Sequence, residues 1–113
     1  MKKVLMVCTG NLDRSPTAAM VLAQMRAACW VASAGTEPWA ENRLTRELAD
    51  EADVICVMED AHHRFIRNRF GDAHAAKVVV LDVPDLYVCG EQQLIRILRE
   101  KLRAALELPF GAK

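Results

Sequence analysis

Short apolar runs alternate with amphipathic segments along this chain. The apolar runs predict four strands, at residues 3–8, 30–34, 53–58 and 77–81. Apolar side chains spaced three and four apart predict helices at residues 15–28, 44–50, 60–70 and 91–106. Strands with few polar positions are typical of a sheet covered on both faces, and their alternation with helices predicts right-handed crossovers. The pattern therefore predicts a three-layer α/β/α fold with a parallel sheet.

Particular residues mark the expected ends of these helices. Ser15 and Pro16 supply an N-cap hydroxyl and the residue favoured at the first helical position. Asp60 is expected to cap the third helix, and Gly71 suits the position just beyond its end. Leu44 and Leu48, four residues apart, indicate a short charged helix before the third strand.

Composition narrows the class of protein. The 113 residues, 52% of them apolar, are enough for one domain with one core, which we expect to span residues 1–113. Fifteen basic and fifteen acidic residues cancel, so the broad basic surface of a nucleic-acid-binding protein is not expected. We also expect no membrane-spanning segment. Without an export signal the four cysteines are expected to be free thiols in a reducing compartment, the cytoplasm.

The turn after the first strand concentrates the candidate chemistry. Cys8 ends the strand, five residues separate it from Arg14, and a helix is predicted to start immediately afterwards. A loop whose backbone N–H groups face inward at a helix N-terminus attracts an oxyanion and favours the thiolate form of a cysteine. Because ligands bind beyond the carboxyl ends of parallel strands, Cys8 should share an edge of the sheet with the segment Asp82–Asp85 after the last strand.

These residues fit the requirements of phosphate monoester hydrolysis. Cys8 is the candidate nucleophile, and the planar guanidinium of Arg14 matches two phosphoryl oxygens. Ser15 can donate its hydroxyl to the sulfur, which helps the thiolate leave in a second step. Asp85 is the candidate general acid for the departing oxygen, with Asp82 as the alternative.

Two further loop residues are expected to shape the anion cradle. Asn11 can tie the loop to neighbouring backbone, and Gly10 permits a positive φ.

Taken together, the motifs resemble those of the low-molecular-weight protein tyrosine phosphatases. The matching segments run in order along the chain: Val7–Asn11, Arg14–Ala18, Ser33–Thr36 and Asp82–Tyr87. The resemblance implies a four-stranded parallel sheet, a phosphocysteine intermediate on Cys8, Asp85 as general acid, and no metal or organic cofactor. It implies that the phosphate-binding residues are Thr9, Gly10, Asn11, Leu12, Asp13 and Arg14, and that Trp39 and Tyr87 flank the substrate ring. The expected partners are phosphotyrosine-containing proteins or small aryl phosphates, with inorganic phosphate as product.

The chain departs from the family pattern at several positions. Asp13 stands where many members carry a second cysteine, so a protective disulfide with Cys8 at that position is excluded, and its negative charge lies beside the cradle. Leu86 replaces the usual proline after the acid and removes a restricted φ. Ala19 replaces a frequent carboxylate, and the stretch from Thr36 to Asp53 is short.

Alternative interpretations stay open at this stage. An arsenate reductase would share the loop but requires two further cysteines as a relay, and Met58–Asp60 stands where one is expected. A non-catalytic phosphate-binding module is the third possibility. The other cysteines are expected to be structural, with Cys29 and Cys56 in the core and Cys89 capping a loop. No zinc-site spacing is present around His62, His63 and His74, which are expected on a solvated face.

Overall fold

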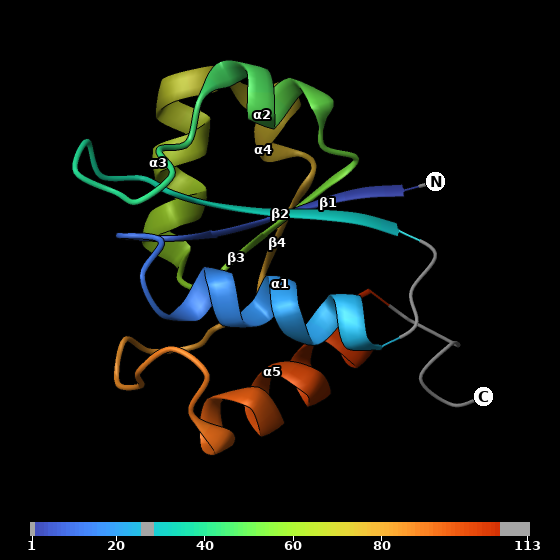
Figure 1. The fold of residues 1–113 in the computed structure, drawn as a ribbon. Coiled ribbons are helices and arrows are strands. Elements are labelled where there is room, and N and C mark those ends of the chain that lie inside the picture. Colours follow the sequence, from blue (N-terminus) through green and yellow to red (C-terminus); the bar gives the residue numbers. More distant parts are fainter. Residues whose placement is uncertain (1, 26–28, 107–113) are drawn as a thin grey trace.

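A parallel sheet with helices on both faces forms the framework of the computed structural model, which describes residues 2–25 and 29–106 (Figure 1). The strands are β1 (Lys2–Cys8), β2 (Cys29–Gly35), β3 (Val54–Val57) and β4 (Val78–Val80). The helices are α1 (Arg14–Gln24), α2 (Arg46–Glu51), α3 (Asp60–Phe70), α4 (Asp72–Ala75) and α5 (Gln92–Ala105). The four strands are parallel in the order β2-β1-β3-β4, which confirms the predicted three-layer fold.

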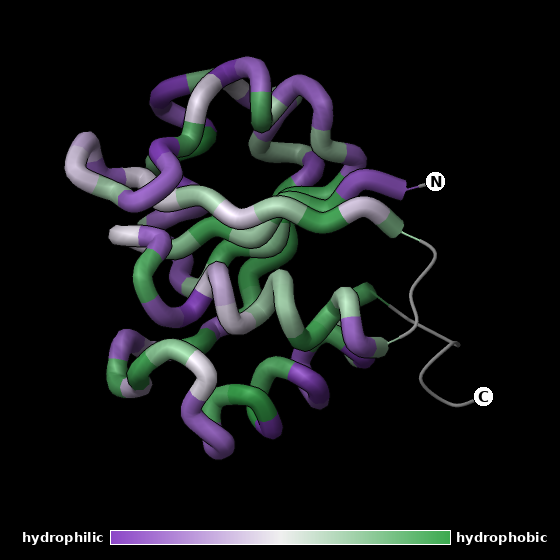
Figure 2. The backbone as a smooth tube through the Cα atoms, viewed as in Figure 1, coloured by the Kyte–Doolittle hydropathy of each residue, from purple (hydrophilic) through white to green (hydrophobic). Residues whose placement is uncertain are grey.

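Two separate apolar clusters hold the layers together. On one face of the sheet, α1 and α5 cover a cluster that includes Met6, Leu22 and Leu98, all fully buried. On the other face, α2 and α3 cover a second cluster around Ile55 and Ile66. Figure 2 shows the apolar strands between the helices, with hydrophilic residues prominent on α2, α3 and α5. The two central strands, β1 and β3, each contribute side chains to both clusters. Their carboxyl ends are therefore rigidly placed.

The caps of two helices differ from those predicted, and α2 begins at Arg46 rather than at residue 44. Asp13, not Ser15, precedes the first residue of α1, and Ser15 lies inside the helix. Glu59, not Asp60, is the N-cap of α3, where its side chain and that of His62 form a reciprocal capping box. In both cases the side chain that the sequence suggested as a cap lies one or two residues inside the helix.

Helix ends also show smaller differences. The predicted helix to residue 28 ends at Gln24, and residues 26–28 lie outside the described residues. Gly71 follows α3 with a φ of 103°, which glycine adopts without strain, and the short helix α4, which the pattern did not predict, begins directly after it. None of the helices within the described part of the chain is long and apolar enough to cross a membrane.

Candidate active site

The loop between β1 and α1 is held with its carbonyl groups turned outward. The carbonyl oxygens of Cys8, Thr9 and Gly10 accept hydrogen bonds of 3.0 to 3.1 Å from backbone N–H groups of the segment after β2. Since C=O and N–H point in opposite directions across a trans peptide, the N–H groups that follow these carbonyls face inward. The Asn11 N–H does so, and donates to the Cys8 Sγ at 3.2 Å. This geometry is that of an anion cradle around the sulfur.

The Cys8 thiol is buried beside the hydroxyl of Ser15. The two side-chain atoms, Sγ and Oγ, lie 3.1 Å apart, and the Ser15 Oγ is also 3.3 Å from the Ala34 carbonyl oxygen. Asn11 Nδ2 donates to the same Oγ at 2.8 Å, so the single hydroxyl proton is left for either the sulfur or the Ala34 carbonyl. A thiolate would take that proton's hydrogen bond because charge-assisted bonds are stronger.

A positive φ occurs in the loop at Asn11, with a value of 56°, and the expectation that Gly10 would supply it is wrong. Asparagine tolerates the left-handed region because its short side chain can form local hydrogen bonds. Packing favours glycine at position 10 for a different reason. A Cβ there would lie 2.6 Å from the ring of Trp39, which packs against the loop.

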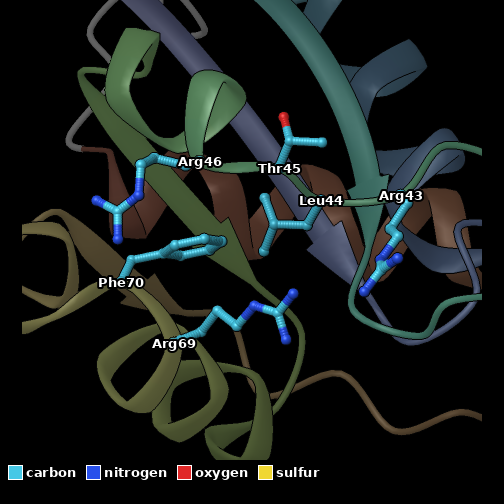
Figure 3. Close-up of a pocket in the computed structure, with 6 residues that line it drawn as sticks. All are labelled: Arg43, Leu44, Thr45, Arg46, Arg69 and Phe70. Carbon is cyan, nitrogen blue, oxygen red and sulfur yellow. The ribbon is translucent and has the colours of Figure 1, made fainter.

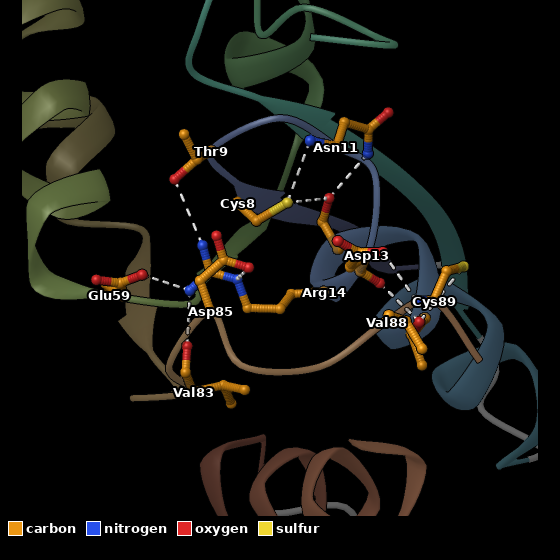
Figure 4. A network of polar contacts seen from close by, with 12 residues as sticks. Cys8, Thr9, Asn11, Asp13, Arg14, Glu59, Val83, Asp85, Val88 and Cys89 are labelled. Carbon is orange, nitrogen blue, oxygen red and sulfur yellow. Dashed lines mark hydrogen bonds and ion pairs between the residues drawn. The ribbon is translucent and has the colours of Figure 1, made fainter. Parts of the chain in front are cut away.

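Arg14 is fully enclosed although it carries a charge. Its side chain is 2% exposed and forms an ion pair with Glu59, and it donates to the Val83 carbonyl at 2.8 Å. The Arg14 Nε lies 3.7 Å from the Asp85 carboxylate, and Nη2 lies 3.4 Å from the Thr9 hydroxyl (Figure 4). Buried guanidinium groups need such partners, and here they hold the planar group at the cradle.

Glu59 and His62 belong to this site, and the sequence analysis missed both. His62 is 4% exposed, so its expected place on a solvated face is wrong. Glu59 N–H donates to His62 Nδ1 at 3.0 Å, which leaves Nε2 to carry the proton toward the Thr9 hydroxyl at 2.9 Å. Burial, assisted by the charge of Arg14, lowers the pKa of His62 to about 4. The neutral imidazole therefore links α3 to the loop at physiological pH.

The position of Glu59 after β3 was the available signal. Residues that follow neighbouring parallel strands meet at one edge of the sheet, and Glu59 follows β3 as Cys8 ends β1.

A small cleft of about 70 Å³ opens above the sulfur. Its lining residues are Cys8, Thr9, Gly10, Leu12, Asp13, Arg14, Trp39 and Asp85. Of the two candidate acids, Asp85 lines the cleft, with its side chain 63% exposed, and Asp82 does not. Asp82 adopts a φ of 62° and its carbonyl accepts from Lys101 Nζ on α5.

The two aromatic residues expected beside the substrate separate in the structure. Trp39 lines the cleft and is 64% exposed, next to Leu12 at 52%. Tyr87 instead packs against the apolar cluster beneath α1 and α5, and is absent from the lining of the cleft. Asp13 lies at the rim with its carboxylate bound to the Cys89 N–H at 2.9 Å.

The remaining cysteines are free and lie outside the cleft above Cys8. Cys56 is fully buried, and burial followed by the proximity of Cys29 raises the pKa of its thiol to about 12. Cys29 is half-buried, and burial also raises the pKa of its thiol. Cys89 is exposed. Among the described residues that line the cleft, Cys8 is the only thiol, and a cysteine relay leading away from it is therefore not built into this cleft.

Comparisons with known proteins bear on the fold that carries this site. No family model and no curated protein sequence matches the chain. Solved structures match it over nearly its whole length. The low molecular weight protein tyrosine phosphatase from Streptococcus pyogenes superimposes with a TM-score of 0.81 and 19% identity, covering 95% of this chain and 92% of that one.

Two further solved structures extend the comparison. Wzb from Vibrio vulnificus, in complex with benzylphosphonate, has a TM-score of 0.77 and 25% identity, with 95% and 99% of the two chains covered. The YwlE arginine phosphatase from Geobacillus stearothermophilus has a TM-score of 0.68 and 24% identity, with 95% and 89% covered. The fold is therefore that of the low-molecular-weight protein tyrosine phosphatases, as the sequence motifs indicated. The structural neighbours include phosphatases of both tyrosine and arginine phosphate.

Proposed function

We propose that this chain is a phosphomonoester hydrolase that acts through a phosphocysteine on Cys8. The observation that carries the proposal is the meeting of three groups at one cleft: the Cys8 sulfur, the Arg14 guanidinium and the Asp85 carboxylate. A cleft of about 70 Å³ suits a phosphoryl group, with the rest of the substrate outside it. Among the structural neighbours, Wzb from Escherichia coli K30 was solved with phosphate, and the Vibrio protein with benzylphosphonate.

In the first step, the Cys8 thiolate attacks phosphorus and the bond to the leaving oxygen breaks. Arg14 and the inward N–H groups of the loop stabilise the charge on the transferring oxygens. Asp85 gives its proton to the leaving oxygen, so an alcohol departs and a carboxylate remains.

In the second step, water attacks the phosphocysteine and Asp85 takes up its proton. The sulfur leaves as a thiolate, which the Ser15 hydroxyl at 3.1 Å stabilises. Inorganic phosphate is released, and the enzyme returns to its starting state.

We propose phosphotyrosine on a protein as the substrate class. Leu12 and Trp39 give the mouth of the cleft apolar walls, which suit the flat face of an aryl group. A phosphoarginine guanidinium would lie against these apolar walls, and of the two carboxylates that line the cleft Asp13 is already bound to the Cys89 N–H, so phosphoarginine is expected to be the poorer substrate. Free thiols at all four cysteines support a cytoplasmic location.

The experiment compares aryl phosphate hydrolysis by three variants. Wild type is expected to hydrolyse para-nitrophenyl phosphate and a phosphotyrosine peptide, and Cys8→Ser to hydrolyse neither. Asp85→Ala should lose about 10²- to 10⁴-fold in kcat on phosphotyrosine, whose leaving group needs a proton, and much less on para-nitrophenyl phosphate. Asp82→Asn is the matched control, because it removes a negative charge from the same segment but from outside the cleft and keeps a residue type that tolerates the φ of 62°.

Three results would contradict the proposal. Full activity of Cys8→Ser would show that Cys8 is not the nucleophile. Equal activity of Asp85→Ala and wild type on phosphotyrosine would show that Asp85 is not the general acid. Phosphate binding without turnover of any phosphomonoester would favour the binding module.

A further inference from the structure

A second cleft, larger than the first, lies on the face of the sheet covered by α2 and α3. It encloses about 350 Å³ and shares no residue with the cleft above Cys8. It is lined by Arg43, Leu44, Thr45, Arg46, Arg69 and Phe70 (Figure 3). The side chain of Leu44 is buried and that of Phe70 half-buried, so the cleft has an apolar floor beneath charged walls.

The three guanidinium groups come from two parts of the chain. Arg43 precedes α2, Arg46 begins it, and Arg69 lies near the end of α3. Figure 3 shows the side chains of Arg43 and Arg69 extending toward each other, with Arg46 beside Phe70. The Arg46 guanidinium lies 5.5 Å from the centre of the Phe70 ring, which helps to fix its position.

Within the described residues, none of these three arginines has a carboxylate within 4.0 Å. Asp50, the carboxylate whose pKa the charge of Arg46 helps to lower, is hydrogen-bonded to His74. Three cations therefore gather around one concave space in a chain whose total charge is zero. A group with several negative oxygens would relieve their mutual repulsion and could bind two guanidinium forks at once.

We propose that this cleft binds a small molecule with two or more adjacent oxyanion groups, such as a polyphosphate. The volume lies within the range typical of small-molecule sites. This inference is independent of the chemistry at Cys8, since the two clefts have no lining residue in common.

Nuclear magnetic resonance with tripolyphosphate as the probe tests the site. The backbone amides around the arginine cleft should shift to saturation in a solution of about 0.15 M salt, where diffuse surface attraction is screened. Arg43→Gln combined with Arg69→Gln should weaken this binding at least about tenfold, as expected for the loss of two charge-assisted hydrogen bonds. Chemical shift changes of the backbone amides in the loop around Cys8 would report binding at the other cleft, and they are followed separately.

Arg96→Gln combined with Arg99→Gln is the matched control, because it removes the same charge from α5. The control should bind as wild type does. Equal weakening in both double variants would mean nonspecific attraction, and the absence of saturable shifts in wild type would mean that no site exists. Either result overturns the proposal.

A different observation concerns the segment that carries Asp85. At its beginning, Val83 N–H donates to the Met58 carbonyl at 2.7 Å, and Arg14 binds the Val83 carbonyl. At its far end, Cys89 N–H donates to Asp13 Oδ1 at 2.9 Å (Figure 4). The segment is therefore attached at its beginning to Met58 and Arg14 and at its far end to Asp13. Arg14 and Asp13 both line the cleft above the Cys8 sulfur.

The far attachment contains a second bond. Gly90 N–H donates to the Thr17 hydroxyl at 3.0 Å, and that hydroxyl donates to the Asp13 carbonyl at 2.6 Å. Between the two attachments, the side chains of Asp85, Leu86 and Val88 are exposed, while Tyr87 packs against the apolar cluster under α1 and α5.

We infer that Asp13 is a positioning residue that fixes Asp85 over the cleft through the Cys89 N–H. This inference rests on the proposed function, in which Asp85 is the general acid. Leu86 lacks the restricted φ that a proline after Asp85 would have. In this inference the Asp13 carboxylate supplies the missing restraint on the segment. The hydrogen bond from the Cys89 N–H also stabilises the negative charge of the Asp13 carboxylate, which lies beside the anion site.

Dependence on the leaving group tests this inference. Asp13→Ala should lower kcat about tenfold on phenyl phosphate, which needs the proton, and less than about threefold on para-nitrophenyl phosphate. Asp13→Asn keeps an oxygen that can accept from the Cys89 N–H and should restore the wild-type ratio of the two rates. The alkylation rate of Cys8 should be the same in Asp13→Ala as in Asp13→Asn, because both variants remove the same negative charge from beside an intact cradle.

Asp85→Ala separates failure of the inference from failure of the proposed function. A leaving-group effect in Asp85→Ala but not in Asp13→Ala would overturn the positioning role alone. An equal loss on both substrates in Asp13→Ala, with Cys8 alkylation altered relative to Asp13→Asn, would assign Asp13 to the cradle and also overturn it. No leaving-group effect in Asp85→Ala would remove the acid itself.

Discussion

Replacing His62 with glutamine tests the buried link between α3 and the loop around the sulfur. The imidazole accepts from the Glu59 N–H and lies 2.9 Å from the Thr9 hydroxyl, so it fits this place in its neutral form. Glutamine has both a donor and an acceptor but does not titrate. The variant therefore removes the protonation of this side chain while a polar group is kept.

The expected magnitude follows from the pKa of His62, which is about 4 against an ordinary value of 6.5. Because the unfolded chain binds the proton more tightly, acid favours unfolding. The contribution of the neutral His62 imidazole to the free energy of unfolding is complete above pH 6.5. This contribution decreases as the pH falls through the window between 6.5 and 4, and it is fully lost below that window. From about pH 8 to about pH 5, this single group should cost the wild type about 2 kcal/mol.

Urea unfolding of both proteins across this pH range provides the assay. The difference in unfolding free energy between wild type and His62→Gln should be constant above about pH 7 and should shift by about 2 kcal/mol toward the variant at about pH 5. Histidine proton resonances give an independent measure of the same titration. A difference that does not change with pH, or a His62 that titrates near 6.5, would refute the reasoning.

Three further outcomes are expected. Gly35→Ala should greatly reduce phosphatase activity, because a Cβ there would lie 2.6 Å from the Thr9 carbonyl oxygen and displace the loop; wild-type kcat/KM in this variant would contradict the packing. Glu59→Gln should lower the free energy of unfolding by about 1–2 kcal/mol, since Arg14 loses its ion pair but Glu59 is partly exposed. Thermal unfolding should show phosphate recovering part of that loss by neutralising Arg14. Cys56, whose pKa is about 12, should resist iodoacetamide at neutral pH in the folded protein and react after unfolding, as mass spectrometry can show.

Local pattern predicted the framework well, for physical reasons that particular elements illustrate. The apolar run of β1 must be covered on both faces, and the amphipathic stripe of α1 must face it, so the turn between them had to lie at the sheet edge. Cys8 is the last residue of β1 and Arg14 is the first residue of α1, so the two lie on either side of that turn. Asp85 follows a parallel strand of the same sheet, which brought it to the same edge.

The sequence alone thus determined the class of fold, the loop and its candidate nucleophile, because these depend on neighbours along the chain. Tertiary structure decided what surrounds them. Glu59 reaches Arg14 across 45 residues, and Asp13 reaches the Cys89 N–H across 76. Such contacts depend on how the strands register and how the helices pack, which no local period encodes. The burial of His62, for the same reason, could be seen only once α3 was placed against the loop.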